Sequence, residues 1–454
     1  KRREMMKGKD CCITLYLQLL LAAISFVPLI SNDAHASTQE MTVEDAIRLG
    51  LKNNYDIQIA RNEAEIAINN KGKGIANFLP VIDTNGDFRY DDTNEKTGSP
   101  TSFGNSVMRT SSSNLSLSWT LFDGFSMFAD KKRYDELAKS GTYQARNTIE
   151  STVVSIMQAF FDLVQQEQLL DVVLDTRAIS KRRLEREEIR RDLGGASSTD
   201  LLNARVNFNN DESTLLDQQL AVTIAGKELN ISLAQDPSTP VVVKKEIVIP
   251  PLDMKLDDLL MLAQKRNSIL LAALHNKRVA EENVRIARSS FWPRLVLNGS
   301  YGYTDRSLFG DAVTTGADRS GSSIESGVGL VLSFNLFNGN VDKINYQNAR
   351  LEELNQDLSL RNIKNEIAGL VQEKYTTVQK RMAKVRLEEQ NTVTAQQNMQ
   401  LQKERYAIGA SDSLDFRDAQ VNYAQAQVSL IIARFDARIS LLEIQQLIGK
   451  VEIE

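Results

Sequence analysis

The sequence predicts a mainly α-helical chain with a membrane β-structure, built from two modules of one design. Two segments are each long enough for a helix of about 100 Å, at ~1.5 Å per residue. Four shorter segments alternate large apolar residues with small polar ones, which is the pattern of strands with two unlike faces. Motifs of the first half recur 213 to 215 positions later, which indicates an internal duplication.

The N-terminal segment, residues 1–36, has the layout of a secretory signal peptide. A basic start precedes the apolar run at 13–30, and AHA at 34–36 is a small-residue cleavage site. A membrane-anchor helix is the alternative, and the cleavage site argues against it. No later segment has the ~18 unbroken apolar residues of a spanning helix, so we expect an exported chain that enters a membrane as a barrel.

The composition after residue 36 argues against an enzyme. The 5 basic and 3 acidic residues of 1–36 contribute +2 to the total of −5, so the remainder carries −7 and has one histidine and no cysteine. We expect no nucleic-acid partner, no metal and no cofactor. His275 is interpreted as a partly packed helix residue, and no phosphate-binding loop occurs.

The duplication sets the organisation of the chain. EDAIRLGLKNN (44–54) matches DDLLMLAQKRN (257–267), and FLPVIDTNGDF (78–88) matches FWPRLVLNGSY (291–301). We place a first repeat at 37–240, a linker at 241–254 and a second repeat at 255–450. The linker region has four prolines around a short β-branched run, so it is either a small strand pair or an extended crossover.

Each repeat reads as helix, strand, loop, strand, long helix, turn and shorter helix. The long helices show coiled-coil spacing, with apolar residues every seven positions (Ile149, Ile156, Leu163, Leu170; Val371, Val378, Val385). The helices at 198–233 and 255–289 total about 70 residues at ~1.5 Å each, as do those at 413–448 and 42–76. Two short helices stacked end to end would therefore match one long helix. In the first repeat we expect a helix at 42–76, strands at 81–91 and 115–124 with a loop at 92–112 between them, and a long helix at 124–192. In the second repeat we expect strands near 295–304 and 328–336.

The strands indicate a lipid-facing sheet. In LSLSWTLFDG (115–124) leucine and tryptophan alternate with serine and threonine, and LVLSFNLFNG (330–339) repeats the pattern. A soluble sandwich with one wet face also alternates. Strands of about 10 residues with aromatic residues on the apolar face are typical of membrane barrels instead. Four strands cannot close a barrel, so we expect the chain to oligomerise.

The chain resembles the TolC-type outer-membrane efflux protein family over essentially everything after residue 36. The resemblance rests on the duplication, the FLP and FWP helix-to-strand joints, the LFDG and LFNG strand-to-helix joints, and the glycine turns before TDLLNA and LDFRDA. It implies a homotrimer with a 12-stranded outer-membrane β-barrel continued by a periplasmic α-helical barrel. It also implies a periplasmic adaptor protein and an inner-membrane pump as partners.

The resemblance also assigns the candidate site residues at the helix turns. Asp415 and Asp418, with Asp200 at the matching place of the first repeat and Tyr406 as a latch, would form the pore entrance. The turns would be the adaptor-docking tips (Gly194, Gly195, Gly409 and Ala410). The alternative for the aspartates is charge that complements a helix start, which suits Asp418 least.

Two further features at these turns have more than one reading. The position where the family has a latch arginine holds Ser411 here, so Arg405 or Arg417 would have to substitute. The run KRRLEREEIRRD (181–192) mixes charges at i, i+4 spacing, which indicates a solvated helix face, with a docking surface as the alternative.

The predicted function is therefore an outer-membrane exit duct of a tripartite efflux or type I secretion system in a Gram-negative bacterium. Small molecules and exported proteins stay open as substrates. A trimeric coiled-coil surface adhesin should show one continuous heptad array without a duplication. A periplasmic adaptor should show one helical hairpin flanked by β-rich halves, whereas this chain has two hairpins.

Overall fold

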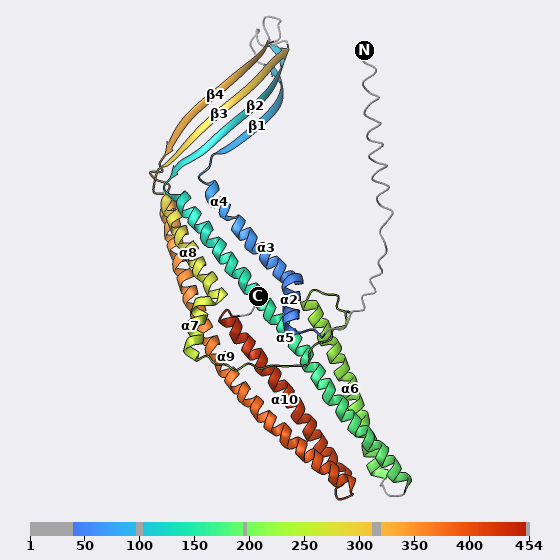
Figure 1. Cartoon of the computed structure of the whole chain (residues 1–454). Helices are drawn as coiled ribbons and strands as arrows, with labels where there is room; N and C mark the ends of the chain where they lie inside the picture. Colours follow the sequence, from blue (N-terminus) through green and yellow to red (C-terminus); the bar gives the residue numbers. More distant parts are fainter. Residues whose placement is uncertain (1–39, 97–102, 194–197, 311–318, 451–454) are drawn as a thin grey trace, which may run out of the picture. The chain divides into compact units, whose positions relative to one another are not determined.

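The computed structural model describes residues 40–96, 103–193, 198–310 and 319–450. The expected signal peptide and two expected tip residues, Gly194 and Gly195, lie outside this part of the chain. The elements run helices, two strands, a long helix and a shorter helix, twice over, as the sequence predicts (Figure 1). They are α2 (Val43–Asn53), α3 (Tyr55–Asn69), α4 (Lys71–Ala76), β1 (Val81–Lys96), β2 (Phe103–Asp123), α5 (Ser126–Asp192) and α6 (Ser198–Ser232), then α7 (Leu256–Arg266), α8 (Ser268–Ser289), β3 (Arg294–Gly310), β4 (Arg319–Ser333), α9 (Val341–Ala407) and α10 (Ser413–Leu447).

The two long helices are equal in length and organise the packing. Helices α5 and α9 each have 67 residues, and α6 and α10 each have 35. The heptad positions of α5 are the centre of the largest apolar cluster, where Ile156, Phe160 and Leu163 are buried against α2, α3 and α6. In α9 the heptad valines Val371 and Val378 belong to a second buried cluster. The apolar residues that recur every seven positions therefore lie on the faces that the long helices bury.

The expected continuous helices at 42–76 and 255–289 are wrong, because asparagine interrupts both. Asn54 ends α2 and caps α3, accepting hydrogen bonds from the backbone N–H groups of Asp56 and Ile57 at 2.9 and 3.2 Å. Asn267 caps α8 in the same way, at 3.1 Å from the N–H of Leu270. A side-chain cap contributes about 1 kcal/mol, which offsets part of the break in the helical ladder. The first expected helix breaks again at Asn70, before α4.

The expected pairing of the short helices, 198–233 with 255–289 and 413–448 with 42–76, is wrong, because the helix ends that meet belong to the same repeat. The side-chain amide of Asn54 donates to the carbonyl oxygen of Ser232, the last residue of α6, at 2.8 Å. The amide of Asn267 donates to the carbonyl oxygen of Leu447, the last residue of α10, at 3.0 Å. Each capping asparagine therefore both starts one helix and closes the end of another.

The sheet has four antiparallel strands in the order β1-β2-β3-β4. The strands have 16, 21, 17 and 15 residues, so the expected length of about 10 is too short. Residues 103–112, expected as loop, form the first half of β2, and the expected strand end at 336 is wrong because β4 ends at Ser333. The run of serine, threonine and asparagine in β2 resembles a loop, but its backbone groups pair with β1 and β3 on both sides.

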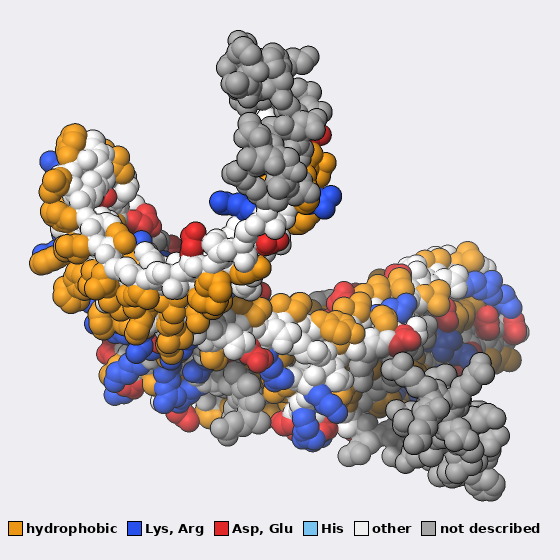
Figure 2. Space-filling model, turned by 90° about the horizontal axis from the view of Figure 1, so that it is seen from above, with side chains coloured by type: hydrophobic (Ala, Val, Ile, Leu, Met, Phe, Trp, Pro, Cys, Tyr) orange, Lys and Arg blue, Asp and Glu red, His pale blue; other side chains and the backbone are white. Residues whose placement is uncertain are grey.

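The register places most of the large apolar residues of the four strands on one face. Directly opposite residues share a face in antiparallel pairs. Leu117 lies opposite Ile82 and Gly299, and Gly299 lies opposite Val328. Ser118 lies opposite Asn298, which lies opposite Gly329, on the other face. Figure 2 shows hydrophobic side chains gathered on the convex side of the curved sheet, whereas its concave side is mostly small and polar.

The strand-to-helix joints LFDG and LFNG are tight turns that use left-handed backbone. Gly124 and Phe125 have φ of 69° and 71°, and Gly339 and Asn340 have 67° and 66°. A Cβ atom at Gly124 would also lie 2.8 Å from Cβ of Trp292 and would collide with the carbonyl oxygen of Ser289. Glycine is therefore required at position 124 by conformation and by space.

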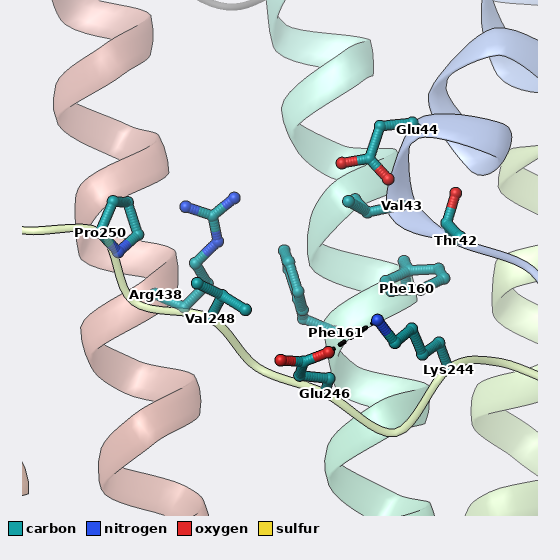
Figure 3. A pocket seen from close by; sticks show the side chains of 10 residues that line it. All are labelled: Thr42, Val43, Glu44, Phe160, Phe161, Lys244, Glu246, Val248, Pro250 and Arg438. Atoms are coloured by element: carbon teal, nitrogen blue, oxygen red, sulfur yellow. Dashed lines mark ion pairs between the residues drawn. The ribbon is translucent and has the colours of Figure 1, made fainter.

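The linker takes the extended form rather than the strand pair. Its one described bridge joins Val243 to Met41 in parallel, with the N–H of Met41 donating to the carbonyl oxygen of Val242 at 2.8 Å. Figure 3 shows the linker passing α5 and α10, where it borders a pocket of about 380 Å³. Phe161 of α5 and Arg438 of α10 face each other there, with the guanidinium 5.1 Å from the ring centroid. The linker thus fastens the two repeats where α5 meets α10.

None of the helices in the described ranges is both long enough and apolar enough to cross a membrane.

Candidate pore entrance

The α9–α10 turn ends one helical hairpin at the end of the molecule away from the sheet (Figure 1). Gly409 has φ of +77°, and the N–H of Ala410 donates to the carbonyl oxygen of Arg405 at 2.8 Å. The N–H of Gly409 donates to the carbonyl oxygen of Tyr406 at 3.2 Å. These two bonds close the end of α9 through a glycine in the left-handed conformation. Helix termination alone therefore explains why glycine stands at position 409.

The three aspartates of the α9–α10 turn have different local roles. Asp412 is the N-cap of α10 and accepts from the N–H groups of Leu414 and Asp415 at 2.9 and 2.8 Å. Asp415 is exposed in the first turn, where its carboxylate complements the helix dipole and accepts from the Ser411 hydroxyl at 3.0 Å. Asp418 is exposed beyond the first turn. Helix-start stabilisation therefore accounts for Asp412 and Asp415 but not for Asp418.

Asp200 lies on a different hairpin from Asp415 and Asp418. Asp200 is half-buried in the first turn of α6, on the α5–α6 hairpin. Asp415 and Asp418 are both exposed on α10, one helical turn apart, whereas Phe416 and Ala419 of the same helix are buried. Within one chain the structure brings together only the two aspartates of α10.

Tyr406 lies in a buried contact between the two hairpins. Its hydroxyl donates to Oε1 of Glu187 on α5, and the two side chains are 5% and 0% exposed. Its ring stacks on Phe416 with centroids 5.4 Å apart. Burial, and then the hydrogen bond to Glu187, raise the pKa of Tyr406 above its ordinary value. The side chain expected to latch the entrance therefore joins α9 to α5.

Arg186 adds a second contact at the same place. Its guanidinium lies 4.4 Å from the Tyr406 ring centroid and donates to the carbonyl oxygens of Tyr406 and Ala407, each at 3.3 Å. Those carbonyls end α9, where a cation is favoured by the helix dipole. The expectation of a solvated face for 181–192 is therefore wrong in part, because Arg183 and Glu187 of that run are buried.

Of the two arginines that could substitute for the latch arginine replaced by Ser411, one joins the hairpins. Arg417 of α10 makes a two-pronged ion pair with Asp211 of α6, with both N–O distances at 2.8 Å. The other choice, Arg405, donates only within its own turn, to the carbonyl oxygen of Ala410 at 3.5 Å. The sequence pattern did not identify Asp211 or Glu187, because each lies more than 200 positions from its partner.

Each hairpin also presents one large apolar residue at its end. Leu193, which follows α5, and Ile408, which follows α9, are both 80% exposed. They occupy equivalent places in the two repeats, 215 positions apart.

His275 takes part in a packed polar contact. Its Nδ1 lies 2.6 Å from Oε2 of Glu136, and its ring stacks on Tyr143 with centroids 5.4 Å apart. Burial acts to raise the pKa of Glu136, but hydrogen bonds from Lys139 and His275 outweigh it and leave the pKa below its ordinary value. Among the residues that the structure describes, no cluster of His, Cys, Asp or Glu has the makings of a metal site.

The model of the family described as outer membrane efflux protein matches residues 46–235 and 259–450, which are the two repeats. The chain belongs to the outer membrane efflux protein family. The outer membrane protein TolC of Vibrio cholerae is 24% identical over 336 residues, covering 73% of each chain. The Campylobacter jejuni CmeC outer membrane channel has a TM-score of 0.76 at 17% identity, with 90% of this chain and 85% of that chain covered. The open state of the Neisseria gonorrhoeae MtrE channel gives 0.72 at 16%, with 90% and 88% covered.

The protein is therefore an outer membrane efflux channel of the TolC type, and the resemblance expected from the sequence is confirmed. The family assignment covers transport and outer-membrane location.

Proposed function

We propose that the protein is the exit duct of a tripartite efflux or type I secretion system, working as a homotrimer. The observation that carries this is the four-stranded sheet with one apolar face, joined to two helices of 67 residues. A single sheet of this kind has two open edges, which lipid does not tolerate. Three copies supply three times four, or twelve, strands for a closed barrel with its apolar side toward lipid.

The helical hairpins form the periplasmic part of the duct in this proposal. Each long helix spans about 100 Å at ~1.5 Å per residue, which suits a tube that crosses a compartment between two membranes. The two hairpins per chain end with exposed Leu193 and Ile408, beside the predicted tips. We assign these ends to a periplasmic adaptor protein, through which an inner-membrane pump supplies the energy.

The entrance of the proposed duct lies at the α9–α10 ends. Asp415 and Asp418 are exposed on one side of α10, and a threefold assembly would carry six such carboxylates around its axis. A ring of carboxylates favours cations. The Tyr406–Glu187 bond and the Arg417–Asp211 pair hold each α9–α10 hairpin on its α5–α6 neighbour. We infer that adaptor binding opens the duct by separating these contacts.

The two alternative classes fit the chain less well. A surface adhesin has no use for a strongly two-sided sheet, and a periplasmic adaptor has no use for strands that gather large apolar residues on one exposed face. Among the described residues of the polar face of the sheet, none favours a small molecule over an exported protein as substrate.

Photo-crosslinking in cells tests the adaptor assignment. A photoreactive amino acid at Ile408 should give an adduct with a periplasmic protein that has long helical hairpins. The same amino acid at Leu358, an exposed position near the sheet end of α9, is the control and should give none. Equal adducts at both positions, or adducts only at Leu358, would refute docking at the tips.

A further inference from the structure

A pocket next to the proposed latch is lined by cations without an acid. It lies between α5 and the α9–α10 hairpin and has a volume of about 280 Å³. Four of its lining residues are cationic (Arg182, Arg183, Arg186 and Lys403), and the remainder are apolar or aromatic (Ile179, Met399, Tyr406, Ala407 and Phe416). None of the described lining residues is Asp or Glu.

The innermost cation is Arg183, which is 3% exposed. Its Nε and Nη1 atoms are buried and have no hydrogen-bond partner in the described part of the chain. Burial, and then the charge of Arg417, lower the pKa of Arg183 from its ordinary value, although the negative charges of Asp211 and Glu187 act against them. A buried guanidinium without a direct acid is costly, since its desolvation is not repaid by a close counter-charge.

The neighbouring acids are engaged elsewhere. Glu187 accepts from the Tyr406 hydroxyl and from Nη1 of Arg190 at 3.3 Å. Asp211 is held by both terminal nitrogens of Arg417. Two nitrogens of Arg183 are therefore left without a hydrogen-bonding acid in the described part of the chain, at a pocket that an anion could enter.

The walls of the pocket limit what that group can be attached to. Ile179, Met399 and Phe416 supply apolar surface beside the guanidinium groups. A carboxylate matches the two-pronged geometry of arginine, and a short apolar or aromatic body suits the remaining wall. Inorganic phosphate would satisfy the charges but would leave the apolar wall uncovered.

We propose that this pocket is a binding site for a small organic anion, in which Arg183 and Arg186 hold the carboxylate and Ile179, Met399 and Phe416 cover its apolar body. Arg186 also donates to the carbonyl oxygens of Tyr406 and Ala407. An anion that draws Arg186 toward the pocket therefore competes with its hold on the end of α9. This site does not depend on the proposed partners or on trimer closure.

Isothermal titration calorimetry on the detergent-solubilised protein at constant ionic strength tests the proposal, with benzoate as the probe. Benzyl alcohol, of similar shape without charge, and inorganic phosphate are the comparison probes. We expect benzoate to bind with a dissociation constant of about 1 mM, and both others at least about tenfold more weakly. Equal binding of benzyl alcohol, or binding of phosphate without benzoate, would overturn the organic-anion assignment.

Two substitutions localise the site, and one serves as control. Arg183→Met removes the buried charge at similar length, so it should keep or raise the melting temperature and weaken benzoate binding about tenfold or more. Lys403→Met should weaken benzoate binding without touching the buried contacts. Lys181→Met, an equal charge change on the exposed side of α5, should leave benzoate affinity unchanged. Unchanged benzoate affinity in Arg183→Met and Lys403→Met would overturn the site.

Discussion

Replacing Tyr406 by Phe removes one hydroxyl from the contact between α9 and α5 and little else. The phenylalanine ring keeps the stack on Phe416 at 5.4 Å and the position of Arg186 above the ring at 4.4 Å. What is lost is a hydrogen bond to a carboxylate that is 0% exposed, and Glu187 keeps Arg190 as its partner at 3.3 Å. Hydrogen bonds to buried charged groups contribute about 1.5–3 kcal/mol.

If opening separates α9 from α5, this bond is present only in the closed state. A loss of about 1.5–3 kcal/mol then shifts the equilibrium toward open by about 13- to 160-fold in each protomer. Single-channel recording in planar bilayers measures the effect as a rise in open probability or mean conductance. Tyr423→Phe, on α10 outside this cluster, is the matched control and should behave as wild type.

A double-variant comparison makes the test specific. Glu187→Gln keeps an acceptor oxygen but removes its charge, so it should also favour the open state. The two changes together should add less than their sum, because both act on the same hydrogen bond. The reasoning is refuted if Tyr406→Phe lowers the melting temperature while its conductance stays at the wild-type level. In that case the bond stabilises the hairpins in every state and is no part of the gate.

Three further predictions follow from the sheet, a helix end and the titration of Tyr406. Leu117→Arg should impair outer-membrane assembly by about 2–4 kcal/mol, whereas Ser118→Arg on the opposite face should be mild in the same membrane-fractionation assay; equal damage would contradict the assigned faces. Ala234→Gly, in the turn after α6 where φ is 52°, should stabilise the protein by about 0.5–1 kcal/mol, while the control Ala221→Gly inside α6 should destabilise it by about 1 kcal/mol in chemical unfolding. Because the pKa of Tyr406 is raised, its contribution to stability is complete below its ordinary pKa of 10.0 and is lost as pH rises through the higher folded value. A difference ultraviolet titration between wild type and Tyr406→Phe should show this tyrosine ionising at a pH above the ordinary tyrosine pKa. Ionisation at or below the ordinary pKa would contradict the buried contact.

The order of elements could be predicted from the sequence because both repeats show the same pattern. A helix seen in one repeat is supported by the same pattern in the other, as with the heptad residues Ile156 and Val371. The alternation in 115–120 also predicted the faces of β2 correctly, since alternation is a local property of the chain.

The helix and strand boundaries that the sequence predicted wrongly lie at residues that suit two kinds of local structure. Asn54 and Asn267 are poor helix formers inside a helix but the best residues to cap one, and their equal place in both repeats was the available signal. The serines at 111–113 suit a loop in isolation. They form strand because β1 and β3 pair with their backbone on both sides.

The contacts at the entrance could not be predicted from local patterns. Glu187 looks like one charge of many in KRRLEREEIRRD, and only the folded chain sets it beside Tyr406. The burial of Arg183 in the same run is equally invisible, because the face that a charged helix buries depends on helices from the other repeat. Charge spacing at i, i+4 described the solvated half of this run and missed the other half.

The central claim, a closed barrel made by three copies of this chain, is tested most directly by single-particle electron microscopy of the detergent-extracted protein. We expect three protomers around one axis, each supplying four strands to a barrel of twelve, with Leu117 and Val328 outward and Ser118 inward. A monomeric particle, or a closed barrel with its serine face toward detergent, would contradict the account.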